Sequence, residues 1–185
     1  MQNNWKLKEE IGEIIMVKFY KVSYEQFKKD FLNSDYKDLN LEESDIELIY
    51  ENIKLPKRAT KASAGYDFYL PYKLTLKHNQ SIKIPTGIRC QMNEDNVLLL
   101  LPRSSLGFKY RFALDNTSGV IDCDYFSALN EGHIQAKMHF YNEPYKYMHL
   151  DTGVAFMQGI FVNYCKTDDD SVEEERTGGF GSTNK

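Results

Sequence analysis

Residues 115–125 read D-N-T-S-G-V-I-D-C-D-Y, and this stretch combines a turn signal, a short apolar run and two carboxylates. The Asn-Thr-Ser-Gly turn followed by an apolar pair predicts a β-hairpin. Alternate side chains of a strand point to opposite faces, so Asp122 and Asp124 are expected on one face, with Cys123 and Tyr125 on the other. An acid beside a tight turn can act as a general base on water. The structural alternative is a turn aspartate followed by a solvated strand aspartate, because short motifs often arise by chance.

From residue 56 to residue 166 the pattern has a period of two, interrupted by turn residues at intervals of about ten. Strands are expected at residues 64–70, 74–76, 82–88, 97–101, 132–141 and 154–164, and the segments between the last two continue the strand pattern. The continuous apolar run 97–101 is typical of a strand that is buried on both faces. Many short strands predict a mainly β core of the sandwich, barrel or jelly-roll type.

Residues 1–55 are expected to form a strand at 13–20 and a two-helix insertion. Each helix begins with a capping-box pattern, Ser23 with Gln26 and Ser44 with Glu47. The apolar positions with helical spacing are Tyr24, Phe27 and Phe31 in the first helix and Ile46, Ile49, Tyr50 and Ile53 in the second. This spacing predicts amphipathic helices at residues 23–32 and 44–52 that pack against something larger.

Residues 167–185 are expected to form an acidic linker followed by a flexible glycine-rich C-terminal arm. The arm contains a single aromatic residue, Phe180, among three glycines. An aromatic side chain in a solvated tail gains nothing by its exposure, so this residue needs a function.

Length and composition limit the class of protein. The 185 residues suffice for one domain with a sizeable core and an appendage. The net charge of −4 argues against a nucleic-acid backbone as the main partner, so a polyanionic ligand would require local positive groups or a bound cation. No apolar run is long enough to span a membrane, and the charged start does not resemble a signal peptide.

Three cysteines, Cys90, Cys123 and Cys165, lie far apart and form no C-x-x-C pair. This pattern predicts reduced, mostly buried thiols in a cytoplasmic protein, rather than a disulfide framework or a zinc site. The four histidines lack metal-ligand spacing and are expected to be surface or core residues.

Two segments are candidates for phosphate binding. Arg103, Ser104 and Ser105 follow the predicted strand 97–101, and an arginine with hydroxyls and backbone N–H groups can hold phosphate oxygens. The alternative is a turn with a surface arginine. The glycine-rich arm is the second candidate, because glycine permits close backbone approach. A P-loop, a G-x-S-x-G elbow and an H-E-x-x-H pair are all missing from the sequence.

Together these segments resemble the trimeric dUTPase family (deoxyuridine triphosphate nucleotidohydrolases) from about Lys54 to Thr183. The five motifs of that family occur in order: A-G-Y-D-F at 64–68, P-R-S-S-L-G at 102–107, G-V-I-D-C-D-Y at 119–125, residues 153–161 with Q-G-I-F at their end, and residues 176–183 with G-G-F-G-S-T at their end. One such motif is a weak signal, whereas five in order are specific.

The resemblance implies a dUTPase-type jelly roll or distorted β-barrel, assembled as a homotrimer with active sites between subunits. Asp122 would deprotonate the water that attacks the α-phosphate of dUTP. Tyr125 would pack under the deoxyribose and exclude a 2′-hydroxyl. The backbone at Gly119 and Ile121, with Asn116 nearby, would read the uracil edge.

The resemblance further implies that Arg103, Ser104, Ser105 and Gln158 hold phosphates, with Asp67 as a supporting residue near the arginines. A magnesium ion would bridge the phosphates and keep its own waters, so no direct protein ligand is expected. The arm would close over the site of a neighbouring subunit, and Phe180 would stack on uracil. The remaining substrate-binding residues of the arm would be Arg176, Gly181, Ser182 and Thr183.

The chain departs from the family pattern in the loop after Tyr125, which is lengthened at residues 126–131, and in residues 1–55, which lie outside the common core. It also departs at Met157, where the family has a small residue, and in the tail, which is one residue shorter between Arg176 and Phe180 and ends at residues 183–185 without the usual glycine. The nearest alternative is a dCTP deaminase, which would use a glutamate after the third motif, and Glu131 is nearby. Another alternative is a dUTP-responsive regulatory protein that binds a partner through the helical insertion. The predicted activity is hydrolysis of dUTP to dUMP and pyrophosphate, which limits uracil incorporation into DNA and supplies dUMP for thymidylate synthesis.

Overall fold

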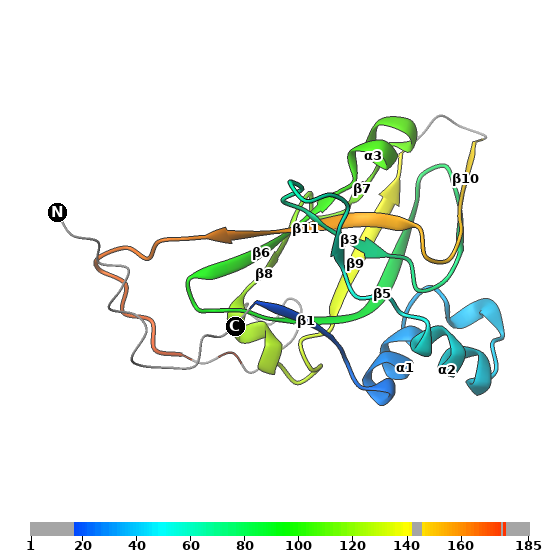
Figure 1. The fold of residues 1–185 in the computed structure, drawn as a ribbon. Coiled ribbons are helices and arrows are strands. Elements are labelled where there is room, and N and C mark those ends of the chain that lie inside the picture. Colours follow the sequence, from blue (N-terminus) through cyan, green and yellow to red (C-terminus); the bar gives the residue numbers. More distant parts are fainter. Residues whose placement is uncertain (1–16, 142–145, 175, 177–185) are drawn as a thin grey trace.

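The computed structural model describes residues 17–141, 146–174 and 176, and its regular structure is mainly β (Figure 1). Of the strand expected at 13–20, only its end falls within the described residues, as β1 (Lys18–Lys21). The glycine-rich arm after Arg176 lies outside them. None of the described helices is long and apolar enough to cross a membrane.

The described strands form antiparallel sheets. The first has the order β1-β5-β9-β7, with β5 (Gln80–Gln91), β9 (Ile134–Phe140) and β7 (Phe112–Leu114). The second has the order β2-β3-β11-β6-β8, with β2 (Lys57–Arg58), β3 (Tyr66–Tyr69), β11 (Ala155–Asn163), β6 (Asn96–Pro102) and β8 (Gly119–Ile121). A third pairs β10 (Tyr147–Leu150) with β4 (Leu74–Lys77). The prediction of a mainly β core with an N-terminal helical insertion is confirmed.

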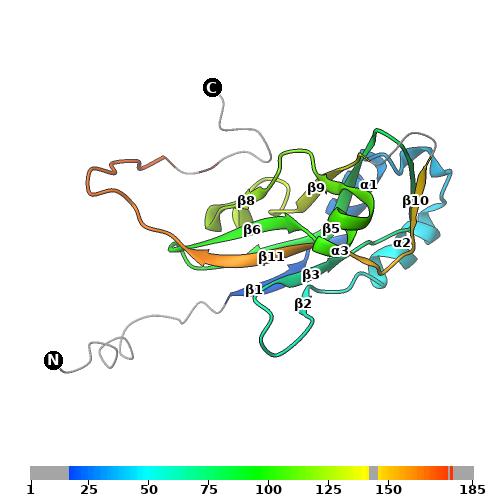
Figure 2. The ribbon, with the colours of Figure 1, turned by 90° about the horizontal axis from the view of Figure 1, so that it is seen from above.

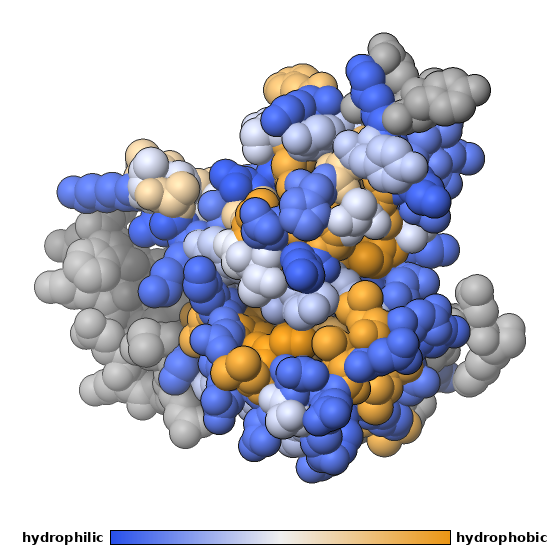
Figure 3. Space-filling model, turned by 90° about the vertical axis from the view of Figure 1, so that its right-hand side faces the viewer, coloured by the Kyte–Doolittle hydropathy of each residue, from blue (hydrophilic) through white to orange (hydrophobic). Residues whose placement is uncertain are grey.

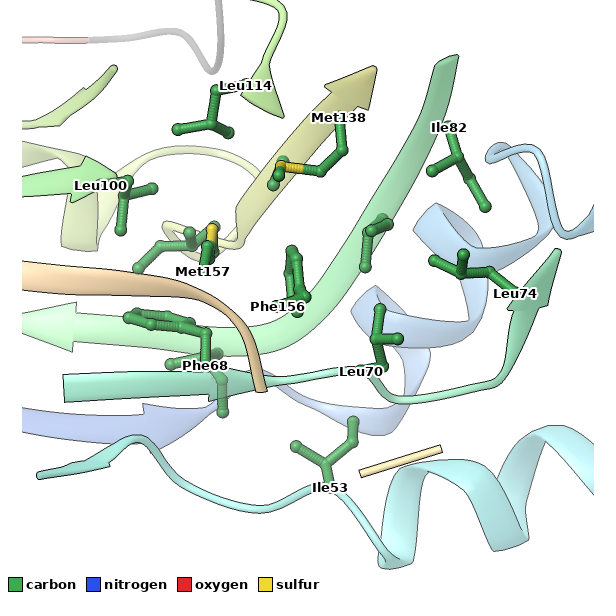
Figure 4. Packing of buried hydrophobic residues seen from close by; sticks show 14 of the residues in the cluster. Ile53, Phe68, Leu70, Leu74, Ile82, Leu100, Leu114, Met138, Phe156 and Met157 are labelled. Atoms are coloured by element: carbon green, nitrogen blue, oxygen red, sulfur yellow. The ribbon is translucent and has the colours of Figure 1, made fainter. Parts of the chain in front are cut away.

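One buried apolar cluster joins these sheets (Figure 4). Phe68 of β3, Leu100 of β6 and Met157 of β11 come from the second sheet, and Met138 of β9 comes from the first. Ile53, which follows the helices, belongs to the same cluster. The helical insert and the β-core therefore share a continuous core instead of packing as separate units.

Strand β6 departs from the prediction that both of its faces are buried. Leu98 and Leu100 are buried, whereas Leu99 and Leu101 are only half-buried. The prediction was wrong for the single chain, because β6 follows the alternation of a sheet with one covered face. The second face of this apolar strand is left partly open.

The stretch 115–125 contains the predicted turn but not the predicted hairpin. Strand β7 before the turn pairs with β9 of the first sheet, while β8 after it pairs with β6 of the second. The turn thus carries the chain from one sheet to the other. Asp122 follows β8 and is the N-cap residue of a 3₁₀ helix, η3 (Cys123–Ser127). Asp124 therefore lies in this helix and not in the expected strand.

Helices α1 (Tyr24–Leu32) and α2 (Glu43–Glu51) lie together at one end of the molecule in Figure 1. The hydroxyl of Ser23 accepts a hydrogen bond from the backbone N–H of Gln26, which confirms Ser23 as the first N-cap. The predicted capping box is not completed, because the Gln26 side chain donates to Asp30 and the Ser23 backbone N–H donates to Glu131. The second cap was predicted wrongly: Glu42 and Asp45 form the capping box, two residues earlier than the Ser44–Glu47 pattern required. A short 3₁₀ helix, η2 (Lys37–Leu39), lies between the two helices.

The apolar faces predicted for both helices point into the core, with Phe27 and Phe31 of α1 and Ile46 of α2 buried. The space-filling view of this end of the molecule shows apolar surface among polar side chains (Figure 3). Leu32, Leu39 and Leu48 are the large apolar residues of α1, η2 and α2 that are exposed.

Candidate active site

Three predicted site residues from three neighbouring strands of the second sheet lie together. In the register of this sheet Gln158 of β11 is opposite Asp67 of β3 on one side and Leu101 of β6 on the other. Arg103 follows β6, and its Nε lies 3.3 Å from Asp67 Oδ1. Gln158 donates to the carbonyl of Pro102 at 3.4 Å. The supporting role expected for Asp67 therefore has a geometric basis, because this carboxylate holds the arginine beside Gln158.

Gly65 is needed for this arrangement. A Cβ atom at residue 65 would lie 2.6 Å from the side-chain oxygen of Gln158, well inside contact distance. Glycine thus leaves room for the amide of Gln158 at the edge of the site.

Ser104 and Ser105 occupy the first turn of a short helix, α3 (Ser104–Tyr110), rather than the turn predicted for this segment. Both serines are exposed, and Arg103 is the N-cap residue of the helix. Exposed hydroxyl groups thus lie at the same edge as the half-buried guanidinium of Arg103 and amide of Gln158, all of them groups that can bind phosphate oxygens.

The two carboxylates of the 119–125 motif meet at a single arginine. Arg176 Nη2 donates to Asp122 Oδ2 at 2.5 Å, and Arg176 Nε donates to Asp124 Oδ1 at 2.8 Å. The side chain of Asp122 is 49% exposed, so its carboxylate is accessible to water and substrate. The two acids do share one direction, although a 3₁₀ turn rather than strand alternation brings them together.

Tyr125 lies beside this group, and the Arg176 guanidinium carbon is 5.7 Å from the centre of its ring. The tyrosine is 3% exposed, and its hydroxyl donates to the carbonyl of His133 at 2.9 Å. Burial raises the pKa of Tyr125 to about 12, so the hydroxyl stays protonated.

A cavity of about 380 Å³ lies between the two sheets beside β8. Asn116 and Gly119, both predicted to read the base, line it. The remaining lining residues are Lys83, Leu100, Leu114, Asp115, Asn130, Gln135, Ala136 and Lys137. This volume is within the range of small-molecule sites. A Cβ at Gly119 would lie 3.1 Å from Leu100, so glycine also brings β8 close to β6 here.

Sequence reasoning missed two polar residues of this cavity, Asn130 and Gln135. The side-chain oxygens of both are buried and have no hydrogen-bond partner among the residues that the structure describes. The nitrogen of Asn130 donates to the Tyr125 hydroxyl at 2.7 Å, which leaves Asn130 Oδ1 as the free acceptor. Buried polar atoms are almost always satisfied, so such acceptors inside a cavity are suited to a ligand with N–H donors. Asn130 belongs to the lengthened loop, and the departure of this loop from the family pattern was the only feature of the sequence that pointed to Asn130 as a site residue.

The sequence profile of the dUTPase family matches residues 51–184. Over 139 residues the chain is 37% identical to the deoxyuridine 5′-triphosphate nucleotidohydrolase of Lactococcus lactis subsp. lactis (strain IL1403), covering 72% of this chain and 91% of that protein. The chain belongs to the dUTPase family. Residues 51–184 include the Asp67–Arg103–Gln158 group, the cavity and the Arg176 contacts.

Solved dUTPase structures have the same fold. The crystal structure of dUTPase from Streptococcus mutans matches with a TM-score of 0.57 at 36% identity, over 64% of this chain and 91% of that one. The D95N mutant dUTPase from phage phi11 of S. aureus matches with a TM-score of 0.59 at 17% identity, over 88% and 99%. That structure shows the coordination of a structural Mg(II) ion. The phage likeness, at this identity, concerns the fold alone.

Within one dUTPase chain the two groups of site residues lie apart. Leu98 of β6 is opposite Ile121 of β8, and Leu100 is opposite Gly119. Strand β8 therefore runs away from the Arg103 end of β6 as it approaches Asp122. Asp122 is therefore level with Val97, and at about 3.3 Å per residue it lies about 20 Å from Arg103 along the strand. Helix α3, which follows Arg103, lies away from β8 in Figures 1 and 2.

Glu131 does not point into the dUTPase site. Its carboxylate accepts hydrogen bonds from the backbone N and the hydroxyl of Ser23, at 2.8 Å and 2.6 Å. Glu131, the residue that favoured a dCTP deaminase, thus connects the lengthened loop to the helical insert. Phe180, Gly181, Ser182 and Thr183 lie outside the described residues.

The cysteines and histidines follow the predictions only in part. Cys90, Cys123 and Cys165 are free, and they are buried, half-buried and exposed respectively, so the expectation of mostly buried thiols was wrong. His133 is fully buried in the core, while His149 is exposed. In the part of the chain that the structure describes, no group of three or more His, Cys, Asp or Glu side chains could hold a metal ion.

Proposed function

We propose that this dUTPase hydrolyses dUTP to dUMP and pyrophosphate by attack of water on the α-phosphate, with Asp122 as the general base. The accessible carboxylate of Asp122 supports this role, because a general base needs both water and substrate within reach. Arg176 donates a hydrogen bond to Asp122 Oδ2, so a positive charge lies beside the place where the substrate phosphates would bind. Arg176 would then exchange part of its contact with Asp122 for a contact with the substrate.

The cavity beside β8 is the proposed site of the nucleoside. Backbone groups at Gly119 and Ile121, together with Asn116, would contact the uracil edge. The unpartnered oxygens of Asn130 and Gln135 support this assignment, because the N3–H group of uracil is a donor that an amide oxygen can accept. The buried ring of Tyr125, fixed through its hydroxyl, would pack under the deoxyribose and leave no space for a 2′-hydroxyl.

The triphosphate would be held by Arg103, Ser104, Ser105 and Gln158, with Asp67 orienting the arginine. A magnesium ion would be held mainly through substrate phosphates and water, beside this polar edge and the half-exposed carboxylates of Asp122 and Asp124. When bound, magnesium would offset the negative charge that builds up during phosphoryl transfer. Phe180, Gly181, Ser182 and Thr183 are proposed to close the site.

A homotrimer with sites between subunits is proposed on one observation above all, the separation of Asp122 from Arg103 by about 20 Å along β6. A nucleoside triphosphate with its α-phosphate at Asp122 and its other phosphates at Arg103 of the same chain would have to bridge this gap. Two copies that share a site remove the conflict. The half-buried leucines of β6 and the 91% exposed Phe108 give such an assembly apolar surface to bury.

The test is pyrophosphate release from dUTP, compared with dCTP, dTTP and UTP, in the presence of magnesium, for the wild type and Asp122→Asn. Turnover of dUTP alone, lost in the variant, is the expected result. Release of ammonia from dCTP would instead place the chain with the deaminases. Sedimentation of the wild type at the mass of three chains checks the assembly, and mixing inactive Asp122→Asn with inactive Arg103→Ala checks whether sites are shared. Activity that returns on mixing requires a site built from two chains.

Regulation of a partner protein through the insert remains a second proposal. It is supported by the exposed leucines of the insert and by the hydrogen bonds from the insert to the loop beside the site. A purified candidate partner should bind the wild type with an affinity that dUTP changes, and a chain lacking residues 23–53 should not bind it. A loss of catalysis in the deleted chain would not test this proposal, because the deletion also removes side chains from the hydrophobic core that the insert shares with the β-sheets.

A further inference from the structure

The helical insert and the lengthened loop, which both depart from the family pattern, are joined to each other. Glu131 of the loop binds the backbone N and the hydroxyl of Ser23, the N-cap residue of α1. On its other side the loop is held by Arg89 of β5, whose Nη2 donates to the carbonyl of Phe126 at 2.5 Å. The Arg89 guanidinium also lies 3.7 Å from the centre of the Phe126 ring. The loop is therefore fixed both to the sheet and to the insert.

A second link passes through His133, which is fully buried. The backbone N–H of Gly87 donates to His133 Nε2 at 2.8 Å, so the ring proton is on Nδ1. His133 Nδ1 lies 2.6 Å from Asp30 Oδ2 of α1, and Gln26 donates to the same oxygen at 2.7 Å. Burial raises the pKa of Asp30, but the hydrogen bonds from His133 and Gln26 outweigh it and keep the pKa below its ordinary value. Asp30 thus acts as an ionised acceptor for His133.

The backbone of His133 leads directly to the proposed sugar-binding residue. Its carbonyl accepts the hydroxyl of Tyr125 at 2.9 Å, and Asn130 of the loop donates to that hydroxyl at 2.7 Å. Gly132 between them has a φ of 66°, and a Cβ there would lie 2.5 Å from the carbonyl oxygen of Tyr125. The tyrosine, the loop and His133 are packed so closely that one of them cannot shift alone.

We propose that Asp30 of the insert is a positioning residue for Tyr125: by fixing His133 it sets the place of the tyrosine that excludes ribonucleotides. This inference rests on the proposed function, since it deepens the role given to Tyr125. Without an acceptor at Asp30, the buried Nδ1–H of His133 loses its partner and the ring has to move to find another. The His133 carbonyl and Tyr125 move with it. The expected effect falls on the choice between dUTP and UTP.

The experiment compares kcat/KM for dUTP with kcat/KM for UTP in Asp30→Ala, Asp30→Asn and Tyr36→Phe. Asp30→Ala is expected to lower the dUTP/UTP ratio about tenfold or more, because small misplacements of substrate-positioning groups are costly. Asp30→Asn should keep the ratio within about threefold, because its amide oxygen can still accept from His133 and Gln26. Tyr36→Phe is the matched control: it removes another bond from the insert to the core, from the Tyr36 hydroxyl to the carbonyl of Tyr72 at 3.3 Å. It should lower the melting temperature and leave the ratio unchanged.

A double-mutant cycle tests whether Asp30 acts through Tyr125. The effects of Asp30→Ala and Tyr125→Phe on the ratio should not add, because both break the same chain of contacts. Full additivity, or an unchanged ratio in Asp30→Ala despite a lower melting temperature, would show that Asp30 only stabilises the fold. If Asp30→Ala does not fold, Glu131→Gln weakens the loop at its other attachment to the insert and is expected to lower the ratio in the same direction.

Binding separates this inference from the proposed reaction. The dissociation constants of dUTP and UTP are measured by calorimetry in the Asp122→Asn background, with and without Asp30→Ala. A wild type without turnover would contradict the proposed reaction, while a smaller preference for dUTP in the Asp30→Ala background would still support the positioning role. An equal preference in both backgrounds would overturn it.

Discussion

Arg176 Nη2 lies 2.5 Å from Asp122 Oδ2, so the proposed general base is held by a guanidinium 54 residues later in the chain. The same guanidinium reaches Asp124 through Nε at 2.8 Å. Asp122 and Asp124 both pair with Arg176, and they differ mainly in the catalytic role proposed for Asp122. Variants of the two residues can therefore be compared directly.

Asp122→Asn and Asp124→Asn are expected to differ sharply in kcat. Loss of the general base should lower kcat by about 10²–10⁴-fold. Loss of Asp124 removes only a half-exposed ion pair, and such pairs contribute up to about 1 kcal/mol, so kcat should fall by no more than about fivefold. Pyrophosphate release at saturating dUTP measures both. Similar losses in the two variants would mean that the pair acts jointly and that Asp122 alone is not the base.

Gly65→Ala should impair substrate binding with little effect on stability. The new methyl group would lie 2.6 Å from the end of the Gln158 side chain, which can swing away without disturbing the backbone. A hydrogen bond to a charged group contributes about 1.5–3 kcal/mol, so KM for dUTP should rise about tenfold or more while kcat changes little. Gly107→Ala is the control for the added methyl group, since a Cβ there would meet no atom of the described residues within 4 Å. A large drop in melting temperature for Gly65→Ala, with KM unchanged, would refute this assignment of Gln158.

Asp67→Asn should raise KM for dUTP severalfold, because Arg103 loses the charged partner that orients it and exposed or half-exposed ion pairs contribute up to about 1 kcal/mol. The control is Asp151→Asn, an exposed carboxylate 3.2 Å from His149 and outside the proposed site. KM of the two variants is compared at one ionic strength, because salt screens such pairs. Equal KM values would remove Asp67 from the supporting role.

The link between the loop and the insert should weaken in acid. Burial raises the pKa of Glu131, but hydrogen bonds from Ser23 and the nearby Arg89 outweigh it and hold the pKa below its ordinary value. A depressed pKa gives stability that is present above the unfolded-state value, about 4.3 for Glu, and is lost as the pH falls through the lower folded-state value. Wild type should therefore melt above Glu131→Gln at pH 6, and the two melting temperatures should converge below about pH 4. A constant difference from pH 6 to pH 3 would show that ionisation of Glu131 does not contribute.

Local sequence patterns predicted much of the fold because they report which side of an element is buried. Period-two alternation located most of the strands but missed β2 and β7, and helical spacing identified the buried faces of α1 and α2. The cap at Ser23 was correct, whereas the cap at Ser44 was wrong. The chain uses Glu42 with Asp45 instead, a pair that the Ser/Thr-x-x-Glu/Gln capping pattern does not include. Local hydrogen-bonding patterns alone do not decide at which of several neighbouring residues a helix begins.

The amino-acid sequence by itself determined the family, the period-two core and the kinds of side chain at the candidate site, because these depend on residue type and spacing. Only the tertiary structure decided where β7 and β8 find partners, since strand pairing is set by contacts distant in sequence. It placed Asp122 and Arg103 on separate parts of one chain, and it joined Asp30 to Tyr125 through His133. Residues 103 positions apart carry no mutual signal in a single sequence, and packing alone brought Asp30 and His133 within hydrogen-bonding distance.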